Sequence, residues 1–231
     1  MIISHKHRFI FIKTMKTAST SLEVFLSQHC GDRGVVTPIY PPVKPHQAQN
    51  YQSNFNPLPE LWLRWRHRQP LQPTLEDYRA HNRFYNHLPA YAIRLRVPGH
   101  TWRTYFKFCV ERNPWDKTLS YYHMRRHDSK QPLSFEAHLS HGDFCLNYPY
   151  YTDIGGDRVI VDQIIQYEKL SQGLSAVCRR LNIPFSGALD IWAKSDRRND
   201  YRPYQQVYTP QQRRLVERVF AKEIELHGYQ F

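Results

Sequence analysis

The stretch KTMKTASTS, residues 13–21, gathers side chains that proteins use to hold an anion at the start of a helix. Lys16 carries a full positive charge, and Ala18 leaves room for a ligand to approach the backbone. Short hydroxyl side chains lie beside them at Thr17, Ser19, Thr20 and Ser21. A helix that begins here directs unpaired N–H groups and the positive end of its dipole toward the loop. The stretch therefore predicts an anion site.

This loop is not the phosphate loop of an ATPase, because it contains no G-x-x-x-x-G-K-[ST] motif and no glycine. A purely structural explanation is also open. Thr20 as a helix cap, with Glu23 three residues later as its partner, would form a capping box without any ligand. The loop taken alone favours neither explanation.

A second candidate lies in RNPWDKTLSYY, residues 112–122. Arg112 ends a predicted strand, and Ser120 lies two turns into the helix predicted to follow. An arginine grips phosphate with two parallel hydrogen bonds, and a serine hydroxyl donates one more. The alternative is that Arg112 pairs with a surface carboxylate while Ser120 is solvated.

Both candidates lie where a strand should give way to a helix. RFIFIK at 8–13 and TYFKFCVER at 104–112 have the aromatic and β-branched content of strands. Leu22, Phe25 and Leu26 then recur at helical spacing after the first strand. After the second strand, the helix is predicted to begin with Asn113 as its cap, Pro114 at its first position and Asp116 in its first turn.

Further elements continue this alternation. One or two strands are predicted in 157–170, a helix over 170–181, and a last helix whose capping box joins Thr209 to Gln212. Strands that alternate with helices predict an α/β fold with a mostly parallel central sheet, flanked by helices on both faces. Ligands of such folds bind at the carboxyl ends of the strands, which is where the two candidate segments begin.

The 231 residues are expected to form one domain, 1–231. Eight of the sixteen prolines fall in 37–73, so this stretch is expected to be an irregular insertion with a short helix near 59–68. A further helix is predicted near 74–88, with Thr74 as its cap. No run of 18 apolar residues occurs, so no transmembrane helix is expected.

The net charge of +12 favours anionic partners, which include nucleic acid, a nucleotide, an anionic glycan and an acidic membrane. Charge alone does not choose among them. The four scattered cysteines form no C-x-x-C pair, so they are expected to be buried free thiols in a reducing compartment.

Taken together, the two segments resemble the sulfotransferases that use 3′-phosphoadenosine 5′-phosphosulfate (PAPS), chiefly their carbohydrate branch. MKTASTSL is similar to the PKTGGTSL-like loop of that family, and RNPWDKTLSYY is similar to its RNPWDRxxSxY segment. The stretch WRTYFKFCVE and the tail from DYRPY to the end also look like this branch. The resemblance covers most of the chain except 37–73, and it implies a three-layer sandwich like that of P-loop NTPases.

The resemblance also implies roles for individual residues. Lys16 would reach the bridging oxygen and the sulfate, while the loop residues around the 5′-phosphate would be Thr17, Ala18, Ser19, Thr20 and Ser21. Arg112 and Ser120 would bind the 3′-phosphate. A later segment, SDRRNDYRPY at 195–204, resembles a loop over the donor, where Arg198 and Arg202 would contact phosphate.

The acceptor hydroxyl needs a base, and histidine suits this task near neutral pH. His87 in YNHLPAYAIR is the choice, because the family often carries a similar His-x-x-Ala segment before the YFKF strand. The rival histidines are His81, His100 and His123.

The segment WLRWRHR, residues 62–68, alternates aromatic and basic side chains. Tryptophan faces stack on sugars and arginines hold acidic groups, so a glycan cleft is one expectation. The other is a helix with a buried tryptophan edge and a solvated basic face.

We therefore expect a cytoplasmic sulfotransferase that acts on a hydroxyl, most readily of a carbohydrate, without a metal ion and without binding nucleic acid. The first alternative is a kinase-like nucleotide phosphotransferase, which the missing glycines and missing GK[ST] disfavour. The second is a non-catalytic binder of nucleic acid or another polyanion, which explains the charge but not the two segments. The acceptor and the oligomeric state do not follow from the sequence.

Overall fold

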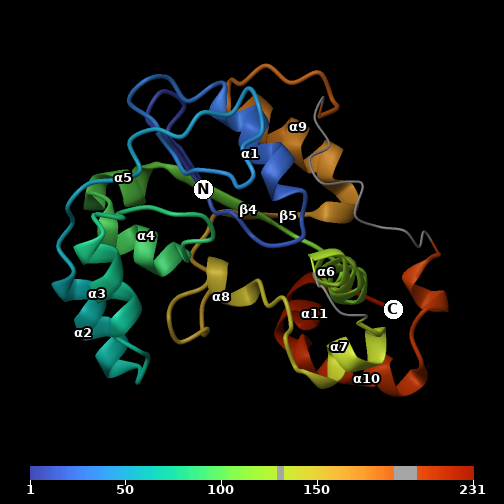
Figure 1. Cartoon of the computed structure of the whole chain (residues 1–231). Coiled ribbons are helices and arrows are strands. Elements are labelled where there is room, and N and C mark those ends of the chain that lie inside the picture. Colours follow the sequence, from blue (N-terminus) through green and yellow to red (C-terminus); the bar gives the residue numbers. More distant parts are fainter. Residues whose placement is uncertain (129–132, 190–201) are drawn as a thin grey trace.

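A computed structural model describes residues 1–128, 133–189 and 202–231. Five strands form one sheet in the order β3-β1-β2-β4-β5, with helices on both faces (Figure 1). β2 (Phe9–Phe11), β4 (Phe106–Glu111) and β5 (Gln163–Gln166) run parallel to one another. The predicted α/β fold with a mostly parallel central sheet is confirmed.

Two short strands extend the sheet beyond β2. β1 (Ile2–Ser4) pairs antiparallel with β2 and with β3 (Val35–Val36). Neither strand was predicted, because segments of two and three residues are too short to show a period.

Alternation along the strands gives the protein a core on each side of the sheet. Phe9 and Phe11 point into one core, while Ile10 and Ile12 point into the other. All four side chains are fully buried, so the segment is hydrophobic throughout, as a strand covered on both faces must be.

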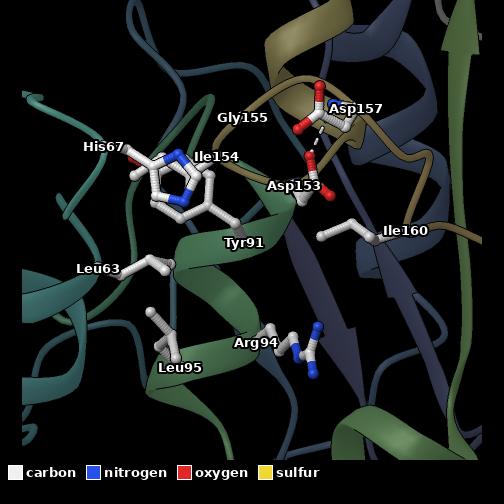
Figure 2. A pocket seen from close by; sticks show the side chains of 10 residues that line it. All are labelled: Leu63, His67, Tyr91, Arg94, Leu95, Asp153, Ile154, Gly155, Asp157 and Ile160. Carbon is white, nitrogen blue, oxygen red and sulfur yellow. Dashed lines mark hydrogen bonds between the residues drawn. The ribbon is translucent and has the colours of Figure 1, made fainter.

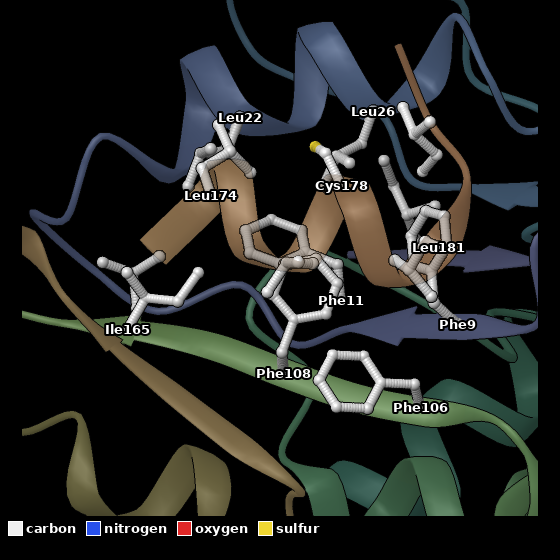
Figure 3. Close-up of a cluster of buried hydrophobic side chains, with 14 of the residues drawn as sticks. Phe9, Phe11, Leu22, Leu26, Phe106, Phe108, Ile165, Leu174, Cys178 and Leu181 are labelled. Carbon is white, nitrogen blue, oxygen red and sulfur yellow. The ribbon is translucent and has the colours of Figure 1, made fainter. Parts of the chain in front are cut away.

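α1 (Ser19–Ser27) and α9 (Leu170–Leu181) cover the first face. Their side chains Leu22, Leu26, Leu174 and Cys178 lie over the aromatic rings of the sheet (Figure 3). α9 lies so close to β5 that a Cβ atom on Gly173 would come within 2.5 Å of Ile165 Cγ2. This close approach explains a glycine in the middle of a helix.

α4 (Ala90–Arg96) and α8 (Tyr148–Tyr151) contribute to the second core. A third cluster joins α6 (Pro114–Asp128), α7 (Phe135–Ser140), α10 (Pro210–Val219) and α11 (Ala221–His227) through Trp115, Leu139, Val216 and Phe220. The capping box of Thr209 and Gln212 is confirmed. The helix predicted to follow it is divided near Phe220 into α10 and α11.

The stretch 37–73 is mostly irregular before α2 (Leu58–Arg66), which is the short helix expected there. α3 (Gln72–Arg79) follows, and α5 (Gly99–Thr104) precedes β4. The prediction that Thr74 caps a helix was wrong. Leu71 occupies the cap position, and the buried Thr74 hydroxyl instead donates to Glu60 Oε1 at 2.8 Å.

All four cysteines are buried and free, as expected. Within the three described ranges, every helix is too short or too polar to cross a bilayer.

Replacing Phe108 tests the first core. The side chain is fully buried and its ring centroid lies 5.3–5.9 Å from those of Phe9, Phe11 and Phe106. Phe108→Ala should lower the free energy of unfolding by about 3–5 kcal/mol, measured by urea titration. Leu226→Ala, at a side chain 45% exposed, is the control and should change it by less than about 0.5 kcal/mol. A Phe108→Ala loss as small as the control's would show that the aromatic cluster is not part of the stabilising core.

Candidate functional site

The loop between β2 and α1 has a strained backbone. Lys16 and Ala18 have φ angles of 60° and 55°, in the left-handed region that side chains other than glycine seldom enter. Such strain persists only where the surrounding structure holds it, and it concentrates at functional sites. The loop thus adopts without glycine a shape for which glycine is the usual residue.

Ala18 is the cap residue of α1, and no side chain caps this end of the helix. The capping box of Thr20 with Glu23 was therefore a wrong interpretation. Glu23 is fully buried and accepts from the Thr37 hydroxyl at 2.9 Å and the Met1 amino group at 2.5 Å. It also pairs with the Lys13 ammonium, so its carboxylate anchors the start of the loop instead of its helix.

Two hydroxyl groups of the loop brace it from within. Ser19 Oγ donates to the Thr14 carbonyl at 2.6 Å, and Thr17 Oγ1 lies 2.9 Å from Thr14 Oγ1. Thr14 in turn donates to the carbonyl of Val110 on β4 at 2.5 Å. Thr17 and Ser19 are buried, so both shape the loop. Their contact with a phosphate stays a prediction, as do those of the half-buried Thr20 and the buried Ser21.

Asn147 holds the loop from the outside. Its Oδ1 accepts from the Met15 N–H at 2.8 Å, and its Nδ2 donates to the Met15 carbonyl at 3.0 Å. The same Nδ2 lies 3.1 Å from Glu111 Oε1. Asn147 is fully buried. Its amide satisfies both backbone groups of Met15, as the backbone of a neighbouring strand would do. The sequence gives no motif that marks this residue.

Glu111, the last residue of β4, is a buried carboxylate with several donors. Lys117 Nζ lies 2.8 Å from its Oε1, and both side chains are fully buried. The Arg112 N–H donates to the same oxygen at 2.8 Å, and the Tyr151 hydroxyl donates to Oε2 at 3.1 Å. A buried charge is tolerated only when it is paired and hydrogen-bonded in this way.

Arg112 connects the two predicted segments. Its Nη1 donates to the carbonyl of Lys16 at 3.2 Å, so the ends of β2 and β4 meet at this side chain. Its Nε and Nη2 donate to Asp116 Oδ2 at 2.9 and 2.6 Å, and its guanidinium lies 4.3 Å from the centre of the Tyr167 ring. The pairing with a carboxylate was the alternative expectation for this arginine, and the structure contains it.

Ser120 is half-buried on α6, one turn beyond Asp116. Residues four apart on a helix lie on the same face. Arg112, Asp116 and Ser120 therefore form one line that begins at the loop and continues along α6. An anion held by Arg112 and Ser120 would lie beside the Asp116 carboxylate.

His87 contacts the loop at its other end. Its Nδ1 lies 3.0 Å from the carbonyl oxygen of Lys13. A carbonyl only accepts, so Nδ1 carries the hydrogen and Nε2 keeps its lone pair in the neutral ring. Burial, helped by the charge of Lys13, lowers the pKa of His87 to about 4. His87 is thus a neutral imidazole whose Nε2 is able to accept a proton.

Tyr150 completes this side of the loop. Its ring centroid lies 5.9 Å from that of His87, and its hydroxyl lies 3.7 Å from the sulfur of Met15. Burial raises the pKa of Tyr150, so it stays a neutral phenol. Neither Tyr150 nor Lys13 was predicted to belong to the site, since an aromatic residue and a lysine carry no signal of their own.

The rival histidines lie elsewhere. His81 and His100 are exposed, and His81 Nδ1 lies 2.5 Å from Asn54 Oδ1. His123 is buried on α6, with its ring centroid 5.2 Å from that of Tyr122.

Arg198 lies outside the described residues. Arg202 is exposed, two residues before Tyr204, whose hydroxyl accepts from Asn113 Nδ2 at 3.2 Å. The segment that carries Arg202 is thereby attached to the end of β4, next to Arg112. A phosphate contact of either arginine stays a prediction.

A cavity of about 320 Å³ lies apart from these residues, between α2, α4 and the loop after α8 (Figure 2). Its walls combine apolar side chains with His67, Arg94, Asp153 and Asp157. None of the residues predicted to bind the donor or to act as the base lines it, whereas Leu63 and His67 belong to the segment 62–68. Among the residues that the structure describes, no group of three or more histidine, cysteine or acidic side chains is arranged to hold a metal ion.

The Glu111–Lys117 pair supports both segments. A double-mutant cycle can measure how much the pair contributes to the free energy of unfolding. Lys117→Met leaves the buried Glu111 without its cation and should lower the free energy of unfolding by about 3–5 kcal/mol. The double variant Glu111→Gln/Lys117→Met should lose clearly less, because the Glu111 carboxylate is removed together with its cation. Glu223, whose Oε1 lies 3.9 Å from Lys117 Nζ, loses the same cation in both variants, so its effect cancels in the comparison. Equal losses from the single and double variants, measured by urea titration, would contradict a stabilising role of the charge pair.

The chain is similar to a solved structure and to an archaeal protein. No protein-family model matches it. It is similar over its whole length to a solved structure of a sulfotransferase from Alicyclobacillus acidocaldarius, with a TM-score of 0.42, 15% identity, and 97% of this chain and 96% of that chain covered. A likeness this distant carries no argument about activity.

The archaeal relative is an uncharacterized protein of Archaeoglobus fulgidus, 35% identical over 119 residues. The match covers 98% of the archaeal protein and 50% of this chain. Because nearly all of that protein is matched at this identity, the chain belongs to the same family as the Archaeoglobus protein.

Proposed function

We propose that the protein is a PAPS-dependent sulfotransferase. The observation that carries the proposal is the hydrogen bond from Arg112 to the carbonyl of Lys16. It brings the MKTASTSL loop and the RNPWDKTLSYY segment, which resemble the two phosphate-binding parts of that family, to one place at the carboxyl ends of β2 and β4. Ligands of parallel sheets bind at such an edge.

The donor would lie between the two segments. Lys16 and the amino end of α1 would face its 5′-phosphosulfate, with the loop hydroxyls nearby. Arg112 and Ser120 would face its 3′-phosphate, the group that distinguishes this donor from ATP. No metal ion is needed in this scheme, because Lys16 and the helix end supply the positive charge.

The transfer requires one proton acceptor and one stabilised leaving group. The acceptor oxygen forms a bond to sulfur as the bond between sulfur and the 5′-phosphate oxygen breaks. The hydroxyl proton passes to Nε2 of His87, and adenosine 3′,5′-bisphosphate leaves with the added negative charge beside Lys16. Positioning and electrostatic stabilisation then supply most of the acceleration, as in phosphoryl transfer.

The surroundings of His87 suit the role of base. The Lys13 carbonyl fixes the tautomer, and the low pKa keeps the ring neutral before the donor binds. The donor brings several negative charges into the site, which raises the pKa of a nearby imidazole. His87 would therefore be a stronger base in the complex than in the free protein.

A carbohydrate acceptor is supported by the resemblance to the carbohydrate branch. The expected glycan cleft at 62–68 has mixed support, because Leu63 and His67 line the cavity between α2 and α4 while the tryptophans and Arg64 do not. Arg64 is buried beside Glu60, and Trp62 and Trp65 are 55% and 69% exposed on the outside of α2. Of the other expectation for this segment, the solvated basic face is confirmed by the exposed Arg66 and Arg68, while the buried tryptophan edge was wrong.

Ligand binding tests the donor site. Arg112→Ala removes a charge-assisted contact and should weaken binding of adenosine 3′,5′-bisphosphate by about 1.5–3 kcal/mol, measured by calorimetry. Binding of adenosine 5′-monophosphate should change little, because it lacks the 3′-phosphate. Arg179→Ala, the same substitution on an exposed part of α9, is the control. Wild-type affinity of Arg112→Ala for the bisphosphate would refute the 3′-phosphate assignment, and wild-type protein that prefers ATP with Mg²⁺ would favour a phosphotransferase.

His87→Gln tests the base, because a glutamine amide can still donate to the Lys13 carbonyl but cannot accept the proton. The variant should keep the affinity for the bisphosphate and lose about 10²–10⁴-fold in turnover. Turnover close to wild type would remove His87 as the base and direct attention to His81, His100 and His123.

The pH dependence gives an independent check on His87. Its pKa is about 4 in the free protein, so the acid limb of kcat/KM should lie near that pH, well below 6.5. The limb of kcat should lie at higher pH, because the bound donor raises the pKa. Nitrogen chemical shifts of the imidazole should show Nδ1–H at neutral pH. A free-protein pKa near 6.5 by the same NMR titration would contradict the buried, neutral ring.

A further inference from the structure

α2 presents its apolar side to solvent. Leu58, Trp62 and Trp65 recur at i, i+4 and i+7, and they are 68%, 55% and 69% exposed. A surface helix of a globular protein usually turns such a stripe toward the core. Here the opposite side is buried, and it carries Glu60 and Arg64.

A buried ionic cluster fixes this orientation. Glu60 accepts from Arg96 at 2.8 and 3.1 Å and from Arg64 at 3.3 Å. Arg96 also pairs with Asp77 of α3 at 2.8 Å. Turning α2 to bury its tryptophans would expose apolar contacts and leave these charges unpaired, which is costly. The exposed stripe is therefore a stable feature of the fold.

α3 repeats the pattern. Leu71 directly before it and Leu75 are each 36% exposed, and Tyr78 is 44% exposed, again at i, i+4 and i+7. α2 and α3 lie at the periphery of the molecule (Figure 1). The two stripes place large apolar and aromatic side chains on projecting helices.

Positive charge adjoins the stripe of α2. Arg66 and Arg68 are exposed directly after Trp65, and the guanidinium of Arg66 lies 5.4 Å from the centre of the Trp62 ring. The whole chain has a net charge of +12. Tryptophan beside arginine is typical of helices that lie in the headgroup region of a membrane, where the ring enters the acyl boundary and the cation meets phosphate.

We propose that the stripe Leu58, Trp62 and Trp65, with Arg66 and Arg68, docks the protein on the surface of a bilayer that contains anionic phospholipid. This is peripheral binding, with α2 parallel to the surface, and it is independent of the sulfotransferase proposal. Charge complementarity selects this occupant: a second copy of the chain would bring the same cations face to face. A sugar polymer is better held in a cavity, and none of the stripe residues lines the cavity between α2 and α4.

The experiment is sedimentation of the full chain with vesicles. The protein should bind vesicles of phosphatidylcholine and phosphatidylglycerol in equal parts, and bind pure phosphatidylcholine vesicles far more weakly. Trp62→Ser/Trp65→Ser should reduce the partition coefficient by about tenfold or more. Arg66→Gln/Arg68→Gln should reduce it by about fivefold for each arginine at low salt. Arg179→Gln/Arg218→Gln, the same charge change on other exposed helices, is the matched control.

Circular dichroism and thermal melting show whether each variant is folded, so that a loss of structure is not mistaken for a loss of binding. Three results would overturn the proposal: no binding to anionic vesicles, binding that both stripe variants retain, or an equal effect of the control. Light scattering measures the oligomeric state, and sedimentation with an acidic polysaccharide tests that alternative partner. Dimers that the tryptophan variant abolishes, or binding of an acidic polysaccharide in place of vesicles, would assign the stripe to those partners.

Discussion

The position of Glu111 is the constraint on which the candidate site depends. This one buried carboxylate, at the end of β4, the middle one of the three parallel strands, pairs with Lys117 of α6 and accepts from Asn147. Asn147 in turn holds both backbone groups of Met15 in the loop after β2. Two segments almost a hundred residues apart are thereby connected to the same charge, and moving them apart would remove the hydrogen bond that Glu111 accepts from Asn147.

A second buried carboxylate has a similar effect at the start of the loop. Glu23 pairs with Lys13, whose carbonyl orients His87. The loop is therefore held at Lys13 and at Met15, with internal bonds from Thr17 and Ser19 between its ends. These restraints explain how Lys16 and Ala18 remain in a left-handed conformation without glycine, because strain persists only where several contacts maintain it.

The fold and the two segments could be read from the sequence because each has a strong local signal. The segment 8–13 reads as a strand from its aromatic and β-branched residues, the helix after β4 starts with a capping residue, and the helix after β5 has periodic apolar positions. The role of Glu23 could not be read, since its spacing from Thr20 matches a capping box while its true partners, Lys13 and Thr37, follow from tertiary packing. Asn147 and the outward stripe of α2 likewise depend on contacts between distant segments, which no periodicity reports.

In the proposed donor site, the ion pair of Arg112 with Asp116 would make anion binding an exchange of one negative partner for another. The guanidinium already has a carboxylate partner, so an incoming anion gains only the difference between its own interaction and that of Asp116. A singly charged anion replaces one negative charge by another and gains little, whereas a phosphate dianion brings more charge and more acceptor oxygens. In the proposed donor site, Asp116 would thus set the interaction that a ligand has to exceed, and Arg112 would discriminate between anions by charge and geometry.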